Sequence, residues 1–343
     1  MVLESIAMEF LGSNILSIDQ FDRKDIDLVF KTADSLLPFA SRQKITRVLQ
    51  GAILSNMFFE PSTRTRISFG SAFNMLGGEV RETTEVEATS LAKGESLYDT
   101  SRVLSGYSDV IVMRHPEVGS VAEFADASRV PVINGGDGDN EHPSQALLDL
   151  FTIQKELESH KKDINSARIS LIGDLKFGRA VHSLCKILML YENVSIKLVS
   201  PEKLKLPGFL IDQLKKKSIS FLETSDIKEG ISDVDILYMT RIQEERFQDS
   251  SEASKYKGLM SLNQDIYTKN CEPNTVIMHP LPRDSRADAN ELDEDLNQNP
   301  NLAIYRQTDN GLLIRMALFS LILGVDGKIN ETSSTVNWFS DKS

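Results

Sequence analysis

The sequence predicts an α/β protein of two domains, each a mainly parallel β-sheet covered by helices. At 343 residues the chain is longer than one hydrophobic core usually supports. Short apolar or β-branched runs alternate with amphipathic stretches along its length. Such alternation gives parallel strands joined by right-handed helical crossovers.

The predicted strands are the short β-branched or apolar runs, at residues 53–59, 109–113, 130–133, 169–172, 194–199, 234–239 and 276–278. The predicted helices are the amphipathic segments between them, which include residues 22–37, 64–76, 145–158, 179–190 and 209–217. We see no internal repeat or low-complexity segment. The tail from Asn330 is polar, and we expect it to be frayed, with Trp338 and Phe339 as candidate late anchors.

The domain boundary is predicted in the helix that follows His142. This helix begins with polar side chains, whereas its later turns are apolar and suited to link two sheets. The apolar positions are Leu147, Leu148, Leu150 and Ile153.

Composition excludes several classes of protein. The formal net charge of -12 disfavours binding to nucleic acid and to acidic lipid surfaces. No apolar stretch reaches the roughly 20 residues of a membrane helix, and Glu4 and Glu9 argue against a signal peptide. Only two cysteines occur, Cys185 and Cys271, which suits a reducing compartment and excludes a cysteine-based zinc site. We therefore expect a cytoplasmic protein.

The most informative run is Phe58-Phe59-Glu60-Pro61-Ser62-Thr63-Arg64-Thr65-Arg66-Ile67-Ser68-Phe69. A buried strand precedes Pro61, which can occupy the first turn of a helix. Ser62 to Thr65 then fall where backbone N–H groups lack intrahelical partners and the helix dipole is positive. Hydroxyls, a guanidinium and free amides there predict a phosphate-binding site. The alternative is a Ser/Thr-capped helix with solvated arginines. The run is not a Walker loop, because it lacks the glycine-rich stretch and the Lys-Ser/Thr.

Arginines also gather in short motifs although the chain is acidic, which indicates a pocket for a small polyanion rather than scattered surface charge. They are Arg64, Arg66, Arg114, Arg179, Arg241 and Arg283. His142 and Gln145 open a predicted helix after a turn-rich loop at residues 134–140, and a capping histidine is the alternative interpretation.

The segment Gly173-Asp174-Leu175-Lys176-Phe177-Gly178 follows a strand and precedes a helix, so we considered a dinucleotide site. It lacks the G-x-G pair, and the next strand ends at Ser200-Pro201 without the acidic residue that holds a ribose. Arg179 is better interpreted as a carboxylate clamp. Arg241 and Gln243, just past another strand, offer a second one, and two guanidiniums match a dicarboxylate.

Together these motifs resemble the aspartate/ornithine carbamoyltransferase family, in the family's order, from about residue 10 to 325. The other matching segments are Ser90-Leu91-Ala92-Lys93-Gly94-Glu95-Ser96, Met113-Arg114-His115-Pro116-Glu117, His142-Pro143-Ser144-Gln145, Gly173-Asp174-Leu175-Lys176-Phe177-Gly178-Arg179, Met239-Thr240-Arg241-Ile242-Gln243 and His279-Pro280-Leu281-Pro282-Arg283. One departure stands out: the family usually has Glu where this chain has Gly70.

The resemblance implies two domains: residues 1–144 bind carbamoyl phosphate and residues 145–310 bind aspartate. It also implies that a last helix, within residues 311–330, returns to the first domain. The carbamoyl phosphate-binding residues that it implies are Ser62, Thr63, Arg64, Thr65, Arg114, His142, Gln145, Pro280, Leu281 and Pro282. Those for aspartate are Lys93, Arg179, Arg241 and Gln243.

An anionic second substrate is favoured over ornithine. The ornithine-specific members typically carry a His-Cys-Leu-Pro segment and a Ser-Met-Gly loop that receives a cation. This chain instead has His279-Pro280-Leu281-Pro282, no Ser-Met-Gly, and an arginine in Thr240-Arg241-Ile242-Gln243.

The polar segment at residues 85–95 taken alone is typical of a solvated surface loop. The resemblance implies instead that Ser90 and Lys93 reach the active site of a neighbouring subunit, which makes a homotrimer obligatory for activity. It also suggests that Glu60, Arg179 and Arg246 form ion pairs that hold the domains closed. A regulatory chain is a further candidate partner.

The implied reaction transfers the carbamoyl group of carbamoyl phosphate to the amine of L-aspartate, a committed step of pyrimidine synthesis in the family. It needs no metal, cofactor or covalent nucleophile. The resemblance implies catalytic roles for Arg64, Thr65, Arg114, His142 and Lys93. The alternatives are a transferase with another amine acceptor and a non-catalytic relative.

Overall fold

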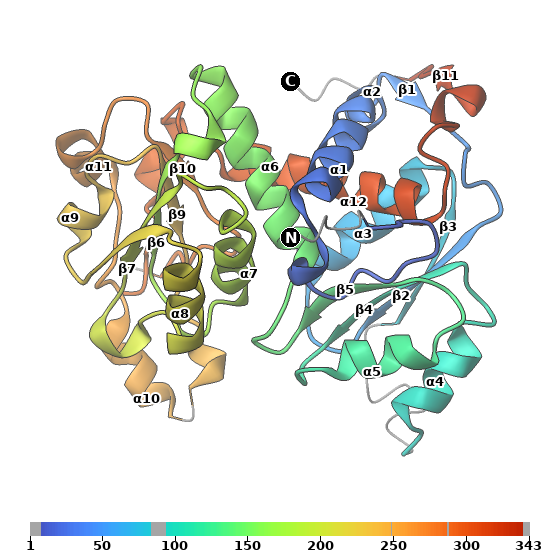
Figure 1. The fold of residues 1–343 in the computed structure, drawn as a ribbon, viewed down its shortest axis with the longest axis horizontal. Coiled ribbons are helices and arrows are strands. Elements are labelled where there is room, and N and C mark those ends of the chain that lie inside the picture. The colour runs from blue at the N-terminus through green and yellow to red at the C-terminus, as the bar shows by residue number, and fades with distance from the viewer. Residues whose placement is uncertain (1–7, 84–93, 248, 287, 339–343) are drawn as a thin grey trace, which may run out of the picture. The chain divides into compact units, whose positions relative to one another are not determined.

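The computed structural model describes residues 8–83, 94–247, 249–286 and 288–338. Two compact units divide the chain (Figure 1): unit 1 contains residues 1–147 and 310–343, and unit 2 contains residues 148–309. The chain passes between them within helices α6 (Pro143–Ser159) and α12 (Ile304–Ile322). No helix in the described part of the chain is long and apolar enough to cross a membrane.

Unit 1 has a four-stranded parallel sheet in the order β3-β2-β4-β5. Its strands are β2 (Ile53–Phe58), β3 (Glu79–Thr83), β4 (Val110–His115) and β5 (Val132–Asp137). Its helices, besides the shared ones, are α1 (Arg23–Ser35), α2 (Leu37–Ala40), α3 (Thr63–Met75), α4 (Leu97–Leu104) and α5 (Ser120–Ala127). Figure 1 shows α4 and α5 on one face of the sheet and α1, α3 and α12 on the other.

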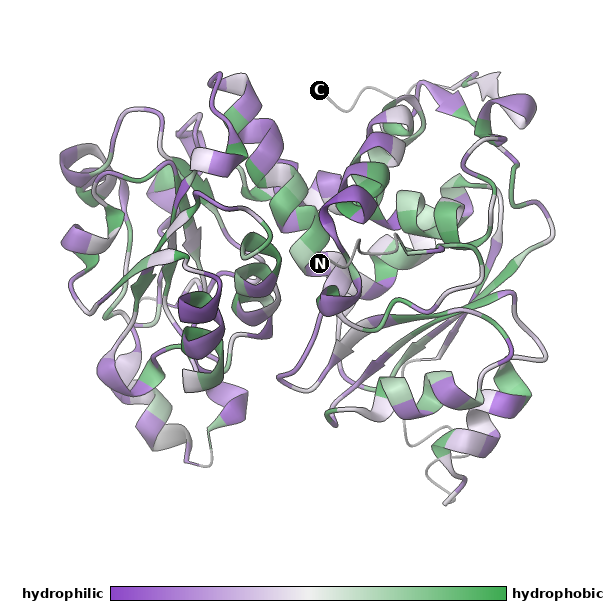
Figure 2. Ribbon diagram, in the orientation of Figure 1, coloured by the Kyte–Doolittle hydropathy of each residue, from purple (hydrophilic) through white to green (hydrophobic). Residues whose placement is uncertain are grey.

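The two faces of this sheet bury different apolar sets. Met57 and Met113 pack with Val121 and Phe124 of α5. On the opposite face, the Phe319 ring of α12 packs edge-on against Phe69 and Phe73 of α3, with centroids 5.9 and 5.0 Å apart. Figure 2 shows the later turns of α12 as mostly apolar, and these turns are buried in unit 1.

Unit 2 has a five-stranded parallel sheet in the order β10-β9-β6-β7-β8. The strands are β6 (Arg168–Ile172), β7 (Ser195–Val199), β8 (Ser220–Thr224), β9 (Ile236–Met239) and β10 (Val276–Met278). The helices are α7 (Arg179–Leu188), α8 (Gly208–Lys216), α9 (Ile227–Ile231), α10 (Ser250–Ala253) and α11 (Gln264–Asn270). Helices α9 and α11 contribute Ile231 and Tyr267 to the core on one face, together with Leu237 and Ile277 of the sheet.

The predicted fold class is confirmed, including the return of the last helix to the first unit. That helix starts at Ile304, earlier than the sequence suggested. Two strands of these sheets were missed, β3 and β8; both lie at sheet edges and have no fully buried residue, so they carry few apolar side chains.

Two local predictions were wrong. Pro61 precedes the N-cap Ser62 and is not in the first turn of α3. The expected loop at residues 134–140 is partly strand, because β5 continues to Asp137. Gly135 of this strand is closely packed: a Cβ there would lie 3.3 Å from the Met113 carbonyl oxygen and 3.4 Å from the Phe58 ring, so these neighbours would have to shift slightly.

The C-terminal tail is more ordered than predicted through Trp338. Strand β11 (Ser334–Thr335) pairs antiparallel with β1 (Lys44–Ile45), and the Thr46 hydroxyl donates to the Ile329 carbonyl over 2.8 Å. Trp338 lines a cavity and is 56% exposed; Phe339 lies outside the described residues.

Asp235 at the start of the β9 region generates a pH prediction. Burial raises its pKa, but the bonds from Arg168 and Lys162 outweigh burial and hold the pKa at about 2. A carboxyl with a depressed pKa stabilises the fold fully above its unfolded value near pH 3.9. That contribution, about 2 kcal/mol, should be lost as the pH falls from about 4 through about 2. Urea unfolding of wild type and Asp235→Asn at pH 7 and pH 3 checks this: the difference between them should shrink at pH 3. An unchanged difference would contradict the assignment.

Candidate active site

Helix α3 follows β2 along the chain, so its first turn lies at the carboxyl edge of the unit 1 sheet. Ser62 is its N-cap with extended backbone (φ -159°), and its hydroxyl caps no helix N–H. Thr63 and Arg64 are exposed, and Thr65 is half-buried. The first turn contains no acidic residue. As in any α-helix, its N–H groups have no intrahelical acceptor, so the turn presents hydroxyls, a guanidinium and amides suited to an anion.

Arg114 lies beside this turn because of strand register. It is the parallel partner of Phe58 at the end of β2, and the Phe59 N–H donates to its carbonyl over 2.8 Å. Its Nε donates to the Glu60 carboxylate over 2.8 Å, and both side chains are largely buried. Glu60, expected to help hold the domains closed, therefore pairs with Arg114 within unit 1.

His142 immediately precedes α6, and its carbonyl accepts the N–H groups of Gln145 and Ala146. The loop before it is organised by Asp137. This buried carboxylate accepts from the Gly119 N–H, the Asn134 and Asn140 amides and the Glu141 N–H, at 2.9–3.1 Å. The sequence analysis did not single out Asp137, because an Asp in a Gly-Asp-Gly-Asp stretch is typical of an ordinary turn.

The edge of the unit 1 sheet therefore gathers the predicted phosphate-binding groups. Strands β2, β4 and β5 are neighbours, and their carboxyl ends lead to the first turn of α3, to Arg114 and to the loop before His142 and Gln145. Ser90 and Lys93 lie outside the described residues.

In unit 2, the buried Asp174 carboxylate connects two loops. Its oxygens accept the N–H groups of Lys176 and Phe177 ahead of α7, and the N–H of Gln243 beyond β9, at 3.0–3.2 Å. Burial raises its pKa, and these N–H bonds counteract only part of that rise. Asp174 thereby fixes both the segment before Arg179 and the one that carries Arg241 and Gln243. The sequence analysis places Asp174 in a motif, but the motif does not show that its carboxylate joins the two loops.

The Arg241 guanidinium is engaged within its own segment. It donates to Glu245 over 2.5 and 3.1 Å and to the Ile242 carbonyl over 3.0 Å. Burial lowers the pKa of Arg241, but Glu245, Glu291 and Asp284 together raise it by more, so the group stays charged. The sequence analysis expects Arg241 to bind a substrate carboxylate; in the structure its guanidinium already binds the carboxylate of Glu245.

Besides the segments that carry Arg179 and Arg241, unit 2 contains a third candidate binding segment, Pro280-Leu281-Pro282, which follows β10. Leu281 has a left-handed backbone (φ 57°), and its N–H donates to His279 Nδ1 over 2.8 Å. Because Nδ1 accepts, the proton is on Nε2, which donates to Glu291 over 2.8 Å. Burial lowers the pKa of His279, consistent with the neutral ring. Glu291 also accepts the Asp284 N–H, so His279 and Glu291 hold the loop from both ends.

A buried polar chain supports this loop from behind. Gln307 of α12 accepts the His279 N–H over 3.0 Å and donates to Asp149 of α6 over 2.6 Å. Asp149 in turn accepts the Tyr238 hydroxyl over 2.6 Å. Within this polar network, Gln307, Asp149 and Tyr238 are hydrogen-bonded to one another or to His279, as their burial requires.

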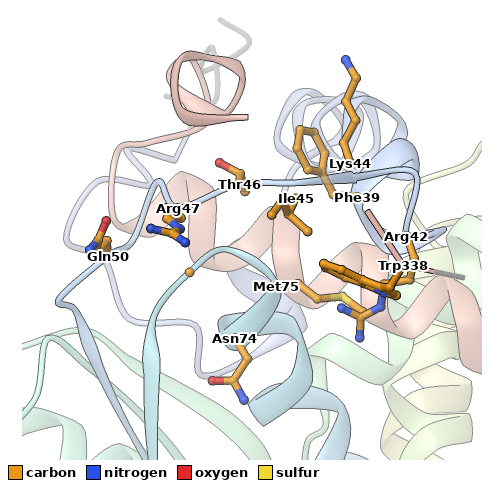
Figure 3. Close-up of a pocket in the computed structure, with 11 residues that line it drawn as sticks. Phe39, Arg42, Lys44, Ile45, Thr46, Arg47, Gln50, Asn74, Met75 and Trp338 are labelled. Carbon is orange, nitrogen blue, oxygen red and sulfur yellow. The ribbon is translucent and has the colours of Figure 1, made fainter. Parts of the chain in front are cut away.

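A separate cavity of about 340 Å³ lies in unit 1, at the other end of α3 (Figure 3). None of the candidate site residues lines it, and Trp338 and Arg42 flank it on one side. Its lining is Phe39, Arg42, Lys44, Ile45, Thr46, Arg47, Gln50, Asn74, Met75, Gly77 and Trp338. Among the described residues, no three His, Cys, Asp or Glu side chains gather as a metal site.

Comparisons with known proteins identify the family. Two sequence models of the aspartate/ornithine carbamoyltransferase family match: the carbamoyl-P binding domain over residues 13–155 and the Asp/Orn binding domain over residues 165–322. The aspartate carbamoyltransferase catalytic subunit of Saccharophagus degradans is 65% identical over 332 residues, 97% of this chain and 98% of the relative. That of Cellvibrio japonicus is 63% identical, with the same coverage.

Solved structures give the same result. The aspartate transcarbamoylase of Trypanosoma cruzi in complex with carbamoyl phosphate and aspartate has a TM-score of 0.82 and 35% identity, covering 92% of this chain and 96% of that one. The catalytic subunit of M. jannaschii aspartate transcarbamoylase has a TM-score of 0.81 and 41% identity, covering 92% and 100%.

Proposed function

The chain belongs to the aspartate/ornithine carbamoyltransferase family, and on that premise we propose that it transfers the carbamoyl group of carbamoyl phosphate to L-aspartate. The products are N-carbamoyl-L-aspartate and phosphate, and the step belongs to pyrimidine synthesis. The observation that carries the proposal is the first turn of α3, with Ser62 to Thr65, set beside Arg114 at the carboxyl edge of the sheet.

Unit 1 is the proposed carbamoyl phosphate-binding domain. The phosphate is bound by the N–H groups and hydroxyls of Ser62, Thr63 and Thr65 and by the Arg64 guanidinium. Arg114 contacts the phosphate and the carbonyl oxygen of the carbamoyl group. His142 donates to the same oxygen and Gln145 holds the amide. From the family resemblance we also assign Pro280, Leu281 and Pro282 to the carbamoyl phosphate-binding residues.

Unit 2 is the proposed aspartate-binding domain. Arg179 and Arg241 each bind one carboxylate, and Gln243 orients the substrate. Two guanidiniums fixed by Asp174-anchored loops match a dicarboxylate and would leave the ammonium of ornithine opposite positive charge.

The reaction needs no covalent intermediate with the enzyme. The uncharged aspartate amine attacks the carbonyl carbon, a C–N bond forms, and the oxygen develops negative charge next to Arg64, Thr65, Arg114 and His142. The C–O bond to phosphate then breaks, and the leaving phosphate accepts the amine proton. Positioning can supply up to about 7–11 kcal/mol of the barrier reduction, and the preorganised cations and donors stabilise the oxyanion.

A coupled assay that offers aspartate, ornithine and other amines with carbamoyl phosphate tests the function. We expect phosphate release with aspartate far above that with the other amines. Release with another amine alone would identify a sister transferase, and release with none would identify a non-catalytic relative.

Arg64→Ala should lower turnover by about 10²–10³-fold, the usual cost of losing one donor to a developing oxyanion. The fold should be unaffected, since Arg64 is exposed. Steady-state kinetics together with thermal unfolding check this, and Arg47→Ala, an exposed arginine at the separate cavity, is the matched control. Normal turnover in a folded Arg64→Ala variant would remove Arg64 from the mechanism.

Arg241 and Glu245 should give opposite effects on aspartate binding. Arg241→Ala removes a carboxylate-binding group, so half-saturation should need at least about tenfold more aspartate, with little change for carbamoyl phosphate. Glu245→Gln removes the carboxylate that competes for the same guanidinium, so it should lower the half-saturating aspartate concentration. If Arg241→Ala weakened carbamoyl phosphate binding instead, the assignment of unit 2 to aspartate would be reversed.

We further propose a homotrimer in the cytoplasm, whose active sites each receive Ser90 and Lys93 from a neighbouring subunit. Both cysteines are free thiols, which suits a reducing compartment. Lys93→Ala and His142→Ala, each inactive alone, should then restore activity when their chains are unfolded, mixed and refolded together. Some interfaces of the mixed trimer would pair an intact Lys93 with an intact His142. Mixed trimers without recovered activity would place Lys93 in its own chain's site or in none.

A further inference from the structure

The edge strand β3 carries a carboxylate that binds the first turn of α3. Glu82 accepts from the Arg66 guanidinium over 2.5 Å with one oxygen and from the Asn56 amide over 3.0 Å with the other. The same Asn56 nitrogen donates to the Arg66 carbonyl over 3.0 Å. Residue 66 is therefore held at both its side chain and its backbone, two positions beyond Arg64.

Asn56, on β2, contacts both other residues and is fully buried. The side chains of Arg66 and Glu82 are about one-third exposed. An exposed ion pair alone contributes little stability. Here the pair shares a buried amide that also binds the helix backbone. This three-residue contact therefore acts mainly on the position of the first turn of α3 relative to β2 and β3. Its effect on the stability of the fold is secondary.

Gly70 leaves room for this arrangement. A Cβ at position 70 would lie 3.4 Å from the nearer Glu82 oxygen and 3.8 Å from the Asn56 amide nitrogen. Positions 66 and 70 are four apart on α3, so a longer side chain at 70 would lie over the same guanidinium. A glutamate there would bring a second carboxylate against Glu82 and compete for Arg66.

We propose that Glu82 is a positioning residue of the phosphate-binding turn, and that it supplies from β3 the carboxylate that position 70 of this chain does not. It orients Arg66 and, with Asn56, fixes the first turn of α3, so that the amides and hydroxyls from Ser62 to Thr65 meet the phosphate. The inference rests on the proposed function, because it assigns the ligand of that turn.

The test is a double-substitution cycle on Glu82→Ala and Gly70→Glu. Glu82→Ala leaves Arg66 without its carboxylate, and Gly70→Glu in the wild-type background places two carboxylates together. Each single variant should weaken binding of inorganic phosphate by about tenfold, within the range of coupling between contacting residues. The double variant should return to within about threefold of wild type, because the carboxylate introduced at position 70 then pairs with Arg66. The kcat/KM for carbamoyl phosphate should follow the same order.

Glu79→Ala is the matched control, since Glu79 is an exposed residue of the same strand that pairs with Arg81. It should change neither phosphate binding nor kinetics. Thermal unfolding of every variant separates positioning from stability: a merely structural role would move the melting temperature and not the phosphate affinity of the folded protein. Glu82→Gln, which keeps the side chain's volume, replaces Glu82→Ala if that variant does not fold.

A double variant as impaired as the singles, or a folded Glu82→Ala with wild-type phosphate affinity, would overturn the proposal. Failure of the proposed function looks different. In that case wild type releases no phosphate from carbamoyl phosphate and aspartate, whatever the cycle shows for binding of inorganic phosphate.

Discussion

The parallel register of β2 against β4 is the constraint on which the proposed phosphate site depends. Pairing Phe58 with Arg114 makes the two strands end together, so the turn into α3 and the arginine must share one edge of the sheet. Parallel strands also require crossovers, which place a helix N-terminus after each strand end. Anion-binding amides and a guanidinium are thus brought together by backbone geometry, before any side chain is oriented.

Buried or half-buried carboxylates then fix the loops at these edges. Asp137, Asp174 and Glu291 each accept backbone N–H groups from the segment that they hold. A carboxylate is well suited to this, because it offers two acceptor oxygens and its bonds to N–H groups are charge-assisted. These three carboxylates therefore organise loops that carry candidate anion-binding groups. The charge balance of the whole chain gives no indication of this division of roles.

The sequence predicted the sheets and the approximate start of α3, because hydrophobic periodicity and helix-capping residues are local signals. It missed β3 and β8, whose edge positions leave them polar, and it placed Gly135 in a loop although β5 continues to Asp137. The candidate cations were found as motif residues. Asp174 was noted only as a member of a motif and Glu291 not at all, because the sequence does not show which N–H groups each carboxylate accepts. Gly70 is the clearest case: in sequence it is a departure from a motif, and only the structure brings Glu82 to its side.

One candidate binding arginine of each unit, Arg114 in unit 1 and Arg241 in unit 2, is held in an ion pair before any substrate binds, and this has an energetic consequence. Arg114 is oriented by Glu60 and Arg241 by Glu245, so neither guanidinium must lose side-chain freedom when an anion binds. A substrate carboxylate or phosphate that displaces such a partner exchanges one charge-assisted contact for another, and the net gain is smaller than a contact count suggests. A cationic ligand is disfavoured for two reasons: it cannot replace the carboxylate that binds the guanidinium, and the guanidinium repels it. Selectivity for anions therefore follows from these pre-oriented pairs, while the catalytic advantage must come from the groups that meet charge only in the transition state.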